Sequence, residues 1–289
     1  MEYINLTAKD GLELSVVLFE AHETKGLLQI IHGAQEHKER YYHFINYLNT
    51  NGFTVIISDN RGHGASVNEQ YPLGYMNGVE EIIEDQVMIT DYIKSRFPGK
   101  ELYLFGHSLG SLFARCYLQK HDYKIKKLVM SGTANYVSLV GVGIFLGKII
   151  TFFSGKHGYS KVLRNLNGNS KDDSWLSASQ ENLIAYRNDP LCQFNYQNNG
   201  MLTVFEADWN LHQYQKYSCH NPELEILSVV GEDDPVTGGE KGLQDSFDAL
   251  RKIGYKHVSS KVYTGMRHEV LNEVDNQRVY EDIVQFLKR

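Results

Sequence analysis

Residues 106–110 of the chain, Gly-His-Ser-Leu-Gly, form the segment best suited to chemistry. Glycine on both sides lets the backbone turn so sharply that the hydroxyl of Ser108 is exposed. A helix that begins after such a turn directs the positive end of its dipole at this hydroxyl. The apolar residues 102–105 predict a strand before the turn, and residues 111–120 predict a helix after it. We therefore predict that Ser108 is a nucleophile, and the alternative is a glycine-rich turn with an ordinary surface serine.

A nucleophilic serine needs a histidine that accepts its proton and a carboxylate that orients the histidine. Where a serine follows a strand in this way, the acid comes after a late strand and the histidine after the last one. Asp234 follows the expected strand 225–230, and His268 follows the expected strand 260–263. We predict Asp234 as the acid and His268 as the base, with Asp233 as the alternative acid. A plain acidic turn without a catalytic role is the structural alternative.

A carbonyl group that is attacked by serine develops negative charge on its oxygen, which two backbone N–H groups can stabilise. Leu109, directly after the serine, is expected to supply one of them. The second is expected from the loop after the strand predicted at 27–31, where the sequence reads His32-Gly33-Ala34. We predict the Ala34 amide as this second donor and a structural role for His32.

Two further features could suggest a metal or phosphate site, and both are interpreted as structural. Residues 59–64, Asp-Asn-Arg-Gly-His-Gly, form a polar turn, but no second ligand cluster accompanies it and no lysine follows its glycines. Cys116, Cys192 and Cys219 are odd in number and widely spaced, which is typical of reduced thiols rather than of disulfides or a metal site. We expect no cofactor and no metal.

The elements that must position these residues alternate between strand and helix, which is typical of a mostly parallel sheet covered on both faces. The predicted fold class is therefore α/β. The expected strands cover residues 3–7, 13–19, 27–31, 55–58, 102–105, 127–130, 225–230 and 260–263, and the expected helices cover 38–51, 79–96, 109–121, 239–253 and 275–288.

The interval 132–223 interrupts this alternation. Connections in compact domains rarely exceed about 15 residues, so such a long interval must carry structure of its own. We expect it to be an inserted helical cap, with residues 1–131 and 224–289 forming the core.

Residues 136–146 within the expected cap are almost wholly apolar. This run is well short of the roughly 20 residues that span a membrane. Val140, Ile144, Phe145 and Ile149 recur at roughly helical spacing and predict a roof over an acyl-binding pocket, which also touches lipid surfaces. The alternative is a helix buried between cap and core.

Composition is that of a soluble globular enzyme. With 289 residues, 42% of them hydrophobic, the chain can bury a substantial core. A net charge of −6 and the lack of a basic tract argue against a nucleic-acid partner. The first ten residues have neither the basic start nor the apolar run of a secretory signal, so we expect a cytoplasmic protein.

Several segments match the patterns of one known family. The family's HGxxEHxxRY pattern is matched by His32-Gly33, Glu36-His37 and Arg40-Tyr41, and its DxRGHG pattern by residues 59–64. Residues 106–110 match its nucleophile elbow, residues 231–236 its GxxDPV turn and residues 265–269 its histidine loop. Residues 175–177 and 189–192 match cap segments of bacterial members. On these residues the chain resembles α/β-hydrolases of the lysophospholipase and monoacylglycerol lipase type, often grouped with serine aminopeptidase-like hydrolases. Ser111 departs from the pattern, because many members have glycine there.

The resemblance implies an α/β-hydrolase fold with an inserted cap and a catalytic triad of Ser108, Asp234 and His268. It implies hydrolysis of lipid-like carboxylic esters, such as monoacylglycerols or lysophospholipids, through an acyl-enzyme and without an obligate protein partner. One alternative is an aminopeptidase-like amide hydrolase, although His32-Gly33-Ala34-Gln35 differs from the HGGPG of proline iminopeptidases. A ligand-binding protein on a hydrolase scaffold is the other, because a fold does not determine a function.

Overall fold

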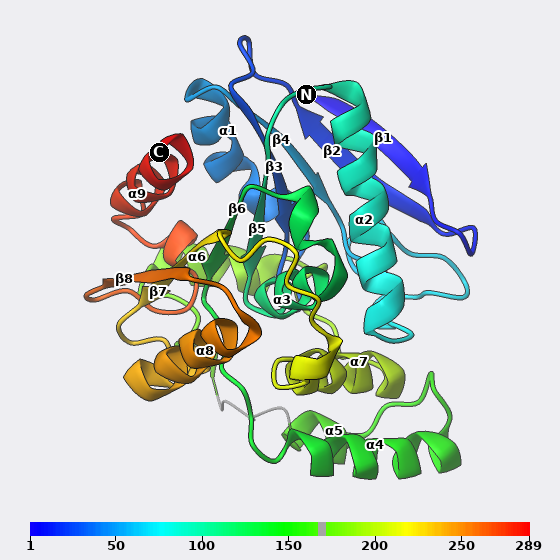
Figure 1. Cartoon of the computed structure of the whole chain (residues 1–289). Helices are drawn as coiled ribbons and strands as arrows, with labels where there is room; N and C mark the ends of the chain where they lie inside the picture. The colour runs from blue at the N-terminus through cyan, green and yellow to red at the C-terminus, as the bar shows by residue number, and fades with distance from the viewer. Residues whose placement is uncertain (167–171) are drawn as a thin grey trace.

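The protein is built around one eight-stranded sheet, described here from a computed structural model that covers residues 1–166 and 172–289 (Figure 1). The strand order is β1-β2-β4-β3-β5-β6-β7-β8. The strands are β1 (Glu2–Thr7), β2 (Glu13–Phe19), β3 (Gly26–Ile31), β4 (Phe53–Ser58), β5 (Leu102–His107), β6 (Lys127–Ser131), β7 (Glu225–Gly231) and β8 (His257–Tyr263). β1 and β2 pair antiparallel, as do β2 and β4, and the pairs from β4 through β8 are parallel. The predicted α/β fold with a mostly parallel sheet is confirmed.

Helices cover both faces of this sheet. On one face lie α1 (Tyr42–Thr50) and α9 (Gln277–Lys288), and on the other lie α2 (Val79–Arg96), α3 (Leu109–His121) and α8 (Gly239–Ile253). Alternate residues of β3 serve the two faces, because Leu27 and Ile31 pack with α2 and α3 while Leu28 and Ile30 pack with α1 and α9. A strand that is buried on both sides is rich in apolar residues, which explains the apolar runs in the sequence. Gln29 of β3 is a buried exception, and its side chain bonds to Gln86 and Thr90.

Most of the predicted elements match the observed ones within two residues at each end, and two differ by more. The helix expected over 38–51 is a 3₁₀ turn, η1 (Lys38–Tyr41), followed by α1. β8 begins at His257, three residues before the expected start at 260. β8 is an edge strand with four exposed residues, so its first half carries no apolar run that the sequence could reveal.

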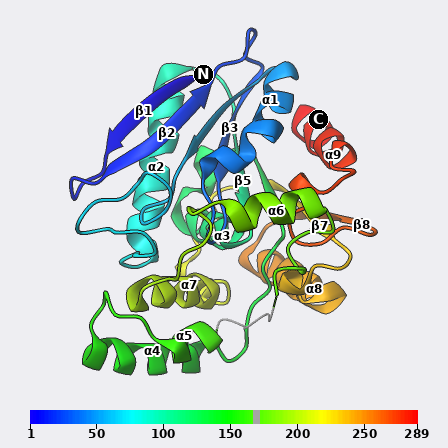
Figure 2. The same ribbon diagram turned by 180° about the vertical axis from the view of Figure 1, so that it is seen from behind.

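The chain between β6 and β7 is helical and contains no strand among its described residues. It holds α4 (Val140–Ser154), α5 (Lys161–Leu166), α6 (Gln180–Asn188) and α7 (Asn198–Asn210). Short 3₁₀ turns lie at Tyr214–Lys216 within this interval and, elsewhere, at Asp122–Lys124, Pro235–Thr237 and Val270–Asn272. α7 packs against α2 and α3, and α4 packs against the far side of α7, so α4 lies at the edge of the molecule (Figures 1 and 2).

The four α4 residues predicted to form a roof divide into two pairs. Val140 is buried and Ile144 packs against the core, whereas Phe145 and Ile149 are exposed, so for these last two the predicted position is wrong. The buried residues of α4 are Val140, Gly143 and Gly147, and Leu202 of α7 approaches so closely that a Cβ at Gly147 would lie 2.4 Å from its Cδ2. Close packing on small residues leaves the larger side chains on the other side, and Phe145 is 65% exposed. Among residues 1–166 and 172–289, none of the helices combines the length and apolar composition needed to cross a bilayer.

Candidate active site

The turn between β5 and α3 has the sharp geometry that its two glycines predict. Ser108 has φ 50° and ψ −118°, a strained conformation for a residue with a side chain. A Cβ at Gly106 would lie 2.4 Å from the Gly110 carbonyl oxygen, and one at Gly110 would lie 2.1 Å from the carbonyl oxygen of Ile31. Neither position can hold a larger residue without moving the backbone. The strain is sustained by hydrogen bonds, since the Ser108 amide donates to the Ser131 carbonyl oxygen at 2.9 Å.

Ser111, which departs from the family pattern, supports the same turn. Its hydroxyl donates to the Ser108 carbonyl oxygen at 2.6 Å, and its amide donates to the same oxygen at 2.8 Å. The serine at this position therefore adds a hydrogen bond that a glycine could not make.

His268 and Asp234 form a buried pair beneath the helical segment, residues 132–224 between β6 and β7. His268 Nδ1 donates to Asp234 Oδ2 at 2.9 Å, and the two residues are 1% and 2% exposed. Asp234 Oδ1 accepts from the Val236 amide at 2.8 Å, which orients the carboxylate. The alternative acid, Asp233, is exposed and makes no hydrogen bond to His268. The structure thus brings Asp234, and not its neighbour, to the histidine.

The surroundings of His268 raise the pKa of its ring and restrict its position. Burial alone would lower the pKa of His268, but the adjacent Asp234 carboxylate outweighs burial and holds this pKa above its ordinary value. Gly132 lies beside the ring, where a Cβ would be 2.8 Å from His268 Cε1. The indole of Trp175 covers another side, with ring centroids 5.1 Å apart.

The outer nitrogen of His268 is free to accept a proton. Nε2 is buried and has no hydrogen-bond partner among the described residues. No hydrogen bond joins it to Ser108 in this conformation, within the parts of the chain that the structure describes.

The loop expected to supply an oxyanion donor lies against the serine. A Cβ at Gly33 would be 3.1 Å from the Ser108 Cβ, so this loop and the turn after β5 are in direct contact. The loop is held from both ends, because Gly33 donates its amide hydrogen to the Glu36 carboxylate and the Gln35 amide donates to the Tyr196 hydroxyl at 3.2 Å. Ala34 lies between these two anchored residues.

A buried ion network that the sequence did not reveal connects this loop to the histidine loop. Arg40 Nη2 lies 2.5 Å from Glu269 Oε2, and Arg40 Nε lies 3.4 Å from Glu36 Oε2. Tyr41 donates its hydroxyl hydrogen to Glu36 at 2.7 Å. Burial raises the pKa of Glu36, whereas Arg40 overcomes burial and lowers the pKa of Glu269, the neighbour of His268. The matching segments EHxxRY and RHE contain these residues, but their pairing across 229 positions is visible only in three dimensions.

The polar turn at 59–64 forms ion pairs and hydrogen bonds of the kind expected for a structural feature. Asp59 Oδ2 accepts from Lys38 Nζ at 2.6 Å, and Arg61 donates to both carboxylate oxygens of Asp85 at 2.7 and 2.8 Å. His32 Nε2 accepts from the Asn60 amide at 2.8 Å, and burial holds the pKa of His32 well below its ordinary value. A neutral His32 that links two loops matches its predicted structural role.

The strand order, the strained serine turn between β5 and α3, and the helical segment after β6 define this protein as an α/β-hydrolase. A model of the family described as Serine aminopeptidase, S33 matches residues 22–275, so the chain belongs to this family of hydrolases. The family relationship predicted from the sequence is confirmed.

Individual relatives are distant but extend over most of the chain. Monoacylglycerol lipase of Mycolicibacterium smegmatis is 25% identical over 274 residues, which are 92% of this chain and 89% of the relative. The crystal structure of a thermostable carboxyl esterase from Bacillus coagulans superimposes with a TM-score of 0.91 at 24% identity, covering 99% of this chain and 97% of the esterase. Paleococcus ferrophilus monoacylglycerol lipase gives a TM-score of 0.77 at 26% identity and covers 96% and 98% of the two chains.

Proposed function

We propose that the protein is a serine hydrolase that cleaves carboxylic esters of lipid-like alcohols, monoacylglycerols above all, through an acyl-enzyme. The observation that carries this proposal is the buried His268–Asp234 pair, joined at 2.9 Å, in the same protein as a strained serine turn. Contact between the Gly33 loop and Ser108 supports the position of the oxyanion donors.

In the proposed mechanism, Ser108 Oγ attacks the ester carbonyl carbon while His268 Nε2 takes the hydroxyl proton. Asp234 keeps the other ring nitrogen protonated and stabilises the imidazolium that forms. The amides of Ala34 and Leu109 donate to the oxyanion of the tetrahedral intermediate. His268 then returns the proton to the departing alcohol, and the acyl group remains on Ser108. Water attacks this acyl-enzyme in the same way, with His268 again as base, and releases the fatty acid.

The first proton transfer requires a hydrogen bond between Ser108 and His268 that the present conformation does not make. Catalytic hydrogen bonds are often long or misaligned without substrate and tighten in the Michaelis complex. The unpartnered Nε2 of His268 supports this assignment, because leaving a buried ring nitrogen without a partner costs stability and a catalytic role explains why this nitrogen is kept unpaired.

Monoacylglycerol is favoured over the other candidate substrates by the extent of the similarity. The Mycolicibacterium smegmatis relative, matched over 92% of this chain, is a monoacylglycerol lipase, as is the Paleococcus ferrophilus neighbour. Lysophospholipids share the acyl ester and differ in a charged headgroup, so they are the second class to test.

We also propose that residues 132–223 are a cap that contacts lipid surfaces through α4. Phe152 and Phe153 are 83% and 82% exposed, and the sequence has no Asp or Glu between Asp122 and Asp172. An exposed apolar face without acidic residues suits the boundary between lipid headgroups and acyl chains. The basic residues on and beside α4, which would meet the headgroups, are Lys148, Lys156, Lys161 and Arg164.

Labelling with a fluorophosphonate tests the proposed nucleophile. We expect peptide mass spectrometry to find the phosphonate on Ser108 alone, and Ser108→Ala to lower kcat by about 10⁶-fold, as loss of a triad serine can. Ser95→Ala, which changes an exposed serine on α2, is the matched control and should be labelled normally. Folded protein that hydrolyses esters while Ser108 stays unlabelled would contradict the assignment.

The substrate class is tested by comparing kcat/KM for a monoacylglycerol, a lysophospholipid and an aminoacyl amide. We expect the monoacylglycerol to give the highest value. A higher value for the amide would favour the aminopeptidase alternative, and no turnover together with no labelling would favour a ligand-binding protein.

A further inference from the structure

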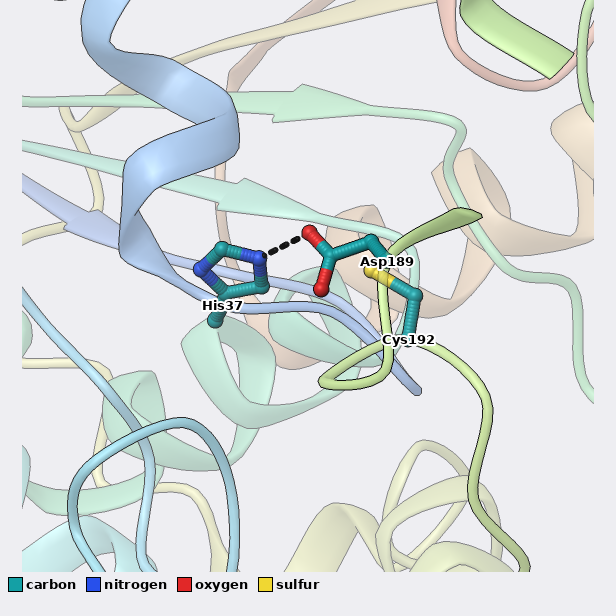
Figure 3. Close-up of side chains that lie close together, drawn as sticks. All are labelled: His37, Asp189 and Cys192. Carbon is teal, nitrogen blue, oxygen red and sulfur yellow. Dashed lines mark hydrogen bonds and ion pairs between the residues drawn. The ribbon is translucent and has the colours of Figure 1, made fainter. Parts of the chain in front are cut away.

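Three side chains that can bind a metal meet where the core touches the helical segment. His37 lies in the loop before η1, and Asp189 and Cys192 lie in the turn that follows α6 (Figure 3). One ligand atom from each, an imidazole nitrogen, a carboxylate oxygen and a thiol sulfur, lies within 4.8 Å of the other two. His37 and Cys192 are 6% and 1% exposed. His37 and Asp189 are 152 positions apart in the chain, so the sequence alone does not indicate this cluster.

The two residues of the helical segment are held in place by their own turn. The Cys192 amide donates to the Asp189 carbonyl oxygen at 3.0 Å, and the Leu191 amide donates to Asp189 Oδ1 at 2.9 Å. Oδ2 of Asp189 therefore faces His37, with 2.6 Å to Nε2. Figure 3 shows this carboxylate and the Cys192 side chain coming from one turn of the chain.

The other nitrogen of His37 has the partner that metal-binding histidines usually have. His37 Nδ1 donates to the Glu39 carboxylate, which leaves Nε2 toward Asp189 and Cys192. A carboxylate on the distal nitrogen fixes the ring and makes the ligating nitrogen more basic. Lys38 Nζ, 3.0 Å from Glu39 Oε1, holds that carboxylate in turn.

We propose that His37, Asp189 and Cys192 bind Zn²⁺, with a water molecule as the fourth ligand. Zinc takes nitrogen, oxygen and sulfur ligands in tetrahedral geometry, and one ligand of each kind is present here. Opening the short contact between His37 and Asp189 is the movement that the ion requires. This site revises the expectation that the cysteines have no metal-binding role, and it does not depend on the proposed hydrolase activity.

Zinc binding at this buried place exchanges the charge of the ion for the protons of its ligands. Without metal, carboxylates face both ring nitrogens of His37, and the Cys192 thiol is buried. Zn²⁺ brings two positive charges and displaces two protons, one from Nε2 and one from the thiol. The remaining charged groups nearby are already paired with one another, namely Lys38 with Asp59 and Glu39, and Arg40 with Glu36 and Glu269.

An ion at this position would add a link between the core and the chain that connects β6 to β7. It would tie the turn at 189–192 to the loop that contains Gly33, Gln35 and His37, and so restrain the loop that contacts Ser108. Because folding assembles the ligands, zinc would also stabilise the folded state, by an amount that grows with the logarithm of its affinity.

Titration of the chelator-treated full chain with Zn²⁺ and Co²⁺ tests the proposal. We expect a stoichiometric site, and a sulfur-to-cobalt charge-transfer band with Co²⁺. At a pH where His37 Nε2 and the Cys192 thiol both carry protons without metal, binding should release about two protons per Zn²⁺. Proton release is measured by calorimetry in buffers of different ionisation enthalpy. The melting temperature should rise with added Zn²⁺.

Three variants and one control define the ligands. Cys192→Ser should abolish the charge-transfer band, Asp189→Asn should weaken zinc binding strongly, and Glu39→Gln should weaken it by about 10–100-fold. Cys116→Ser, which changes a buried thiol in α3, is the control and should bind zinc as the wild type does. Two results would show that the cluster is an ion pair and not a metal site. One is that the wild type does not bind zinc, and the other is that Cys192→Ser and Asp189→Asn both bind it as tightly as the wild type does.

Discussion

Asp233 and Asp234 are neighbours in the chain but lie in different surroundings. Asp234 is buried against His268, whereas Asp233 is exposed. We expect Asp234→Asn to lower kcat by about 10⁴-fold, because the amide would stabilise the wrong tautomer of His268. Asp233→Asn should have little effect. Steady-state kinetics of the two variants decide the question, and a larger loss in Asp233→Asn would reverse the assignment.

The pH dependence of the reaction follows from the same pair. His268 must be neutral to accept the serine proton, so kcat/KM should fall as the pH decreases through the pKa of His268. Since the Asp234 carboxylate raises this pKa above 6.5, the acidic limb should have its midpoint above pH 6.5. In Asp234→Asn the carboxylate is lost and burial remains, so the residual activity should titrate at lower pH. If the acidic limb of the pH profile keeps the same midpoint in Asp234→Asn, the coupling between His268 and Asp234 is contradicted.

The residues of the candidate site differ in how far the sequence could predict them. Ser108, Asp234 and His268 each follow a strand, and the order of the strands along the chain was readable from their apolar runs. Glu36, Arg40 and Glu269 were present in recognised segments, but nothing in their spacing indicated that one arginine would bridge two buried carboxylates. The pattern of residues within a strand and the loop after it predicts where a site residue stands in the sequence. Contacts between loops that are far apart in the sequence depend on how the sheet brings them together.

At the scale of single elements, α4 shows how a correct prediction of type can fail on orientation. The apolar run predicted a helix, but Gly143 and Gly147 form its buried face against α7. Apolar periodicity indicates which residues cluster on a helix, yet glycines carry no side chain and are invisible to that pattern. The exposed Phe145 is therefore expected to leave the preference for acyl chain length unchanged when it is replaced by alanine.

The exposed face of α4 gives a prediction about lipid binding. Phe152→Ser combined with Phe153→Ser should weaken sedimentation with vesicles that contain anionic lipid, because two exposed aromatic rings no longer insert. Hydrolysis of a soluble short-chain ester and the melting temperature should stay near their wild-type values. Val274→Ser, which changes an 87% exposed residue outside the helical segment, is the control. Equal vesicle binding by all three proteins would argue against docking through α4.

At the scale of the whole molecule, stability rests on the sheet. Ile57 of β4 is completely buried, and we expect Ile57→Ala to lower the free energy of unfolding by about 2–5 kcal/mol. Ile184 of α6 is 54% exposed, and Ile184→Ala should change the free energy of unfolding by less than about 0.5 kcal/mol. Denaturant titration measures both values. A similar loss in the two variants would mean that α6 contributes to the core more than its exposure indicates.

The position of the helical segment in the strand order has a consequence for how this protein can diversify. The segment leaves the sheet after β6 and returns at β7, and these strands are neighbours with Ser131 opposite Val229. Because the pair is parallel, the exit at Ser131 and the re-entry at Glu225 lie at opposite ends of neighbouring strands, and the segment is the crossover between them. It can lengthen, shorten or be replaced during evolution without changing any strand pairing, provided that it still crosses from one end of the sheet to the other. New substrate preferences could then arise in the segment while the strands that precede Ser108, Asp234 and His268 keep their register.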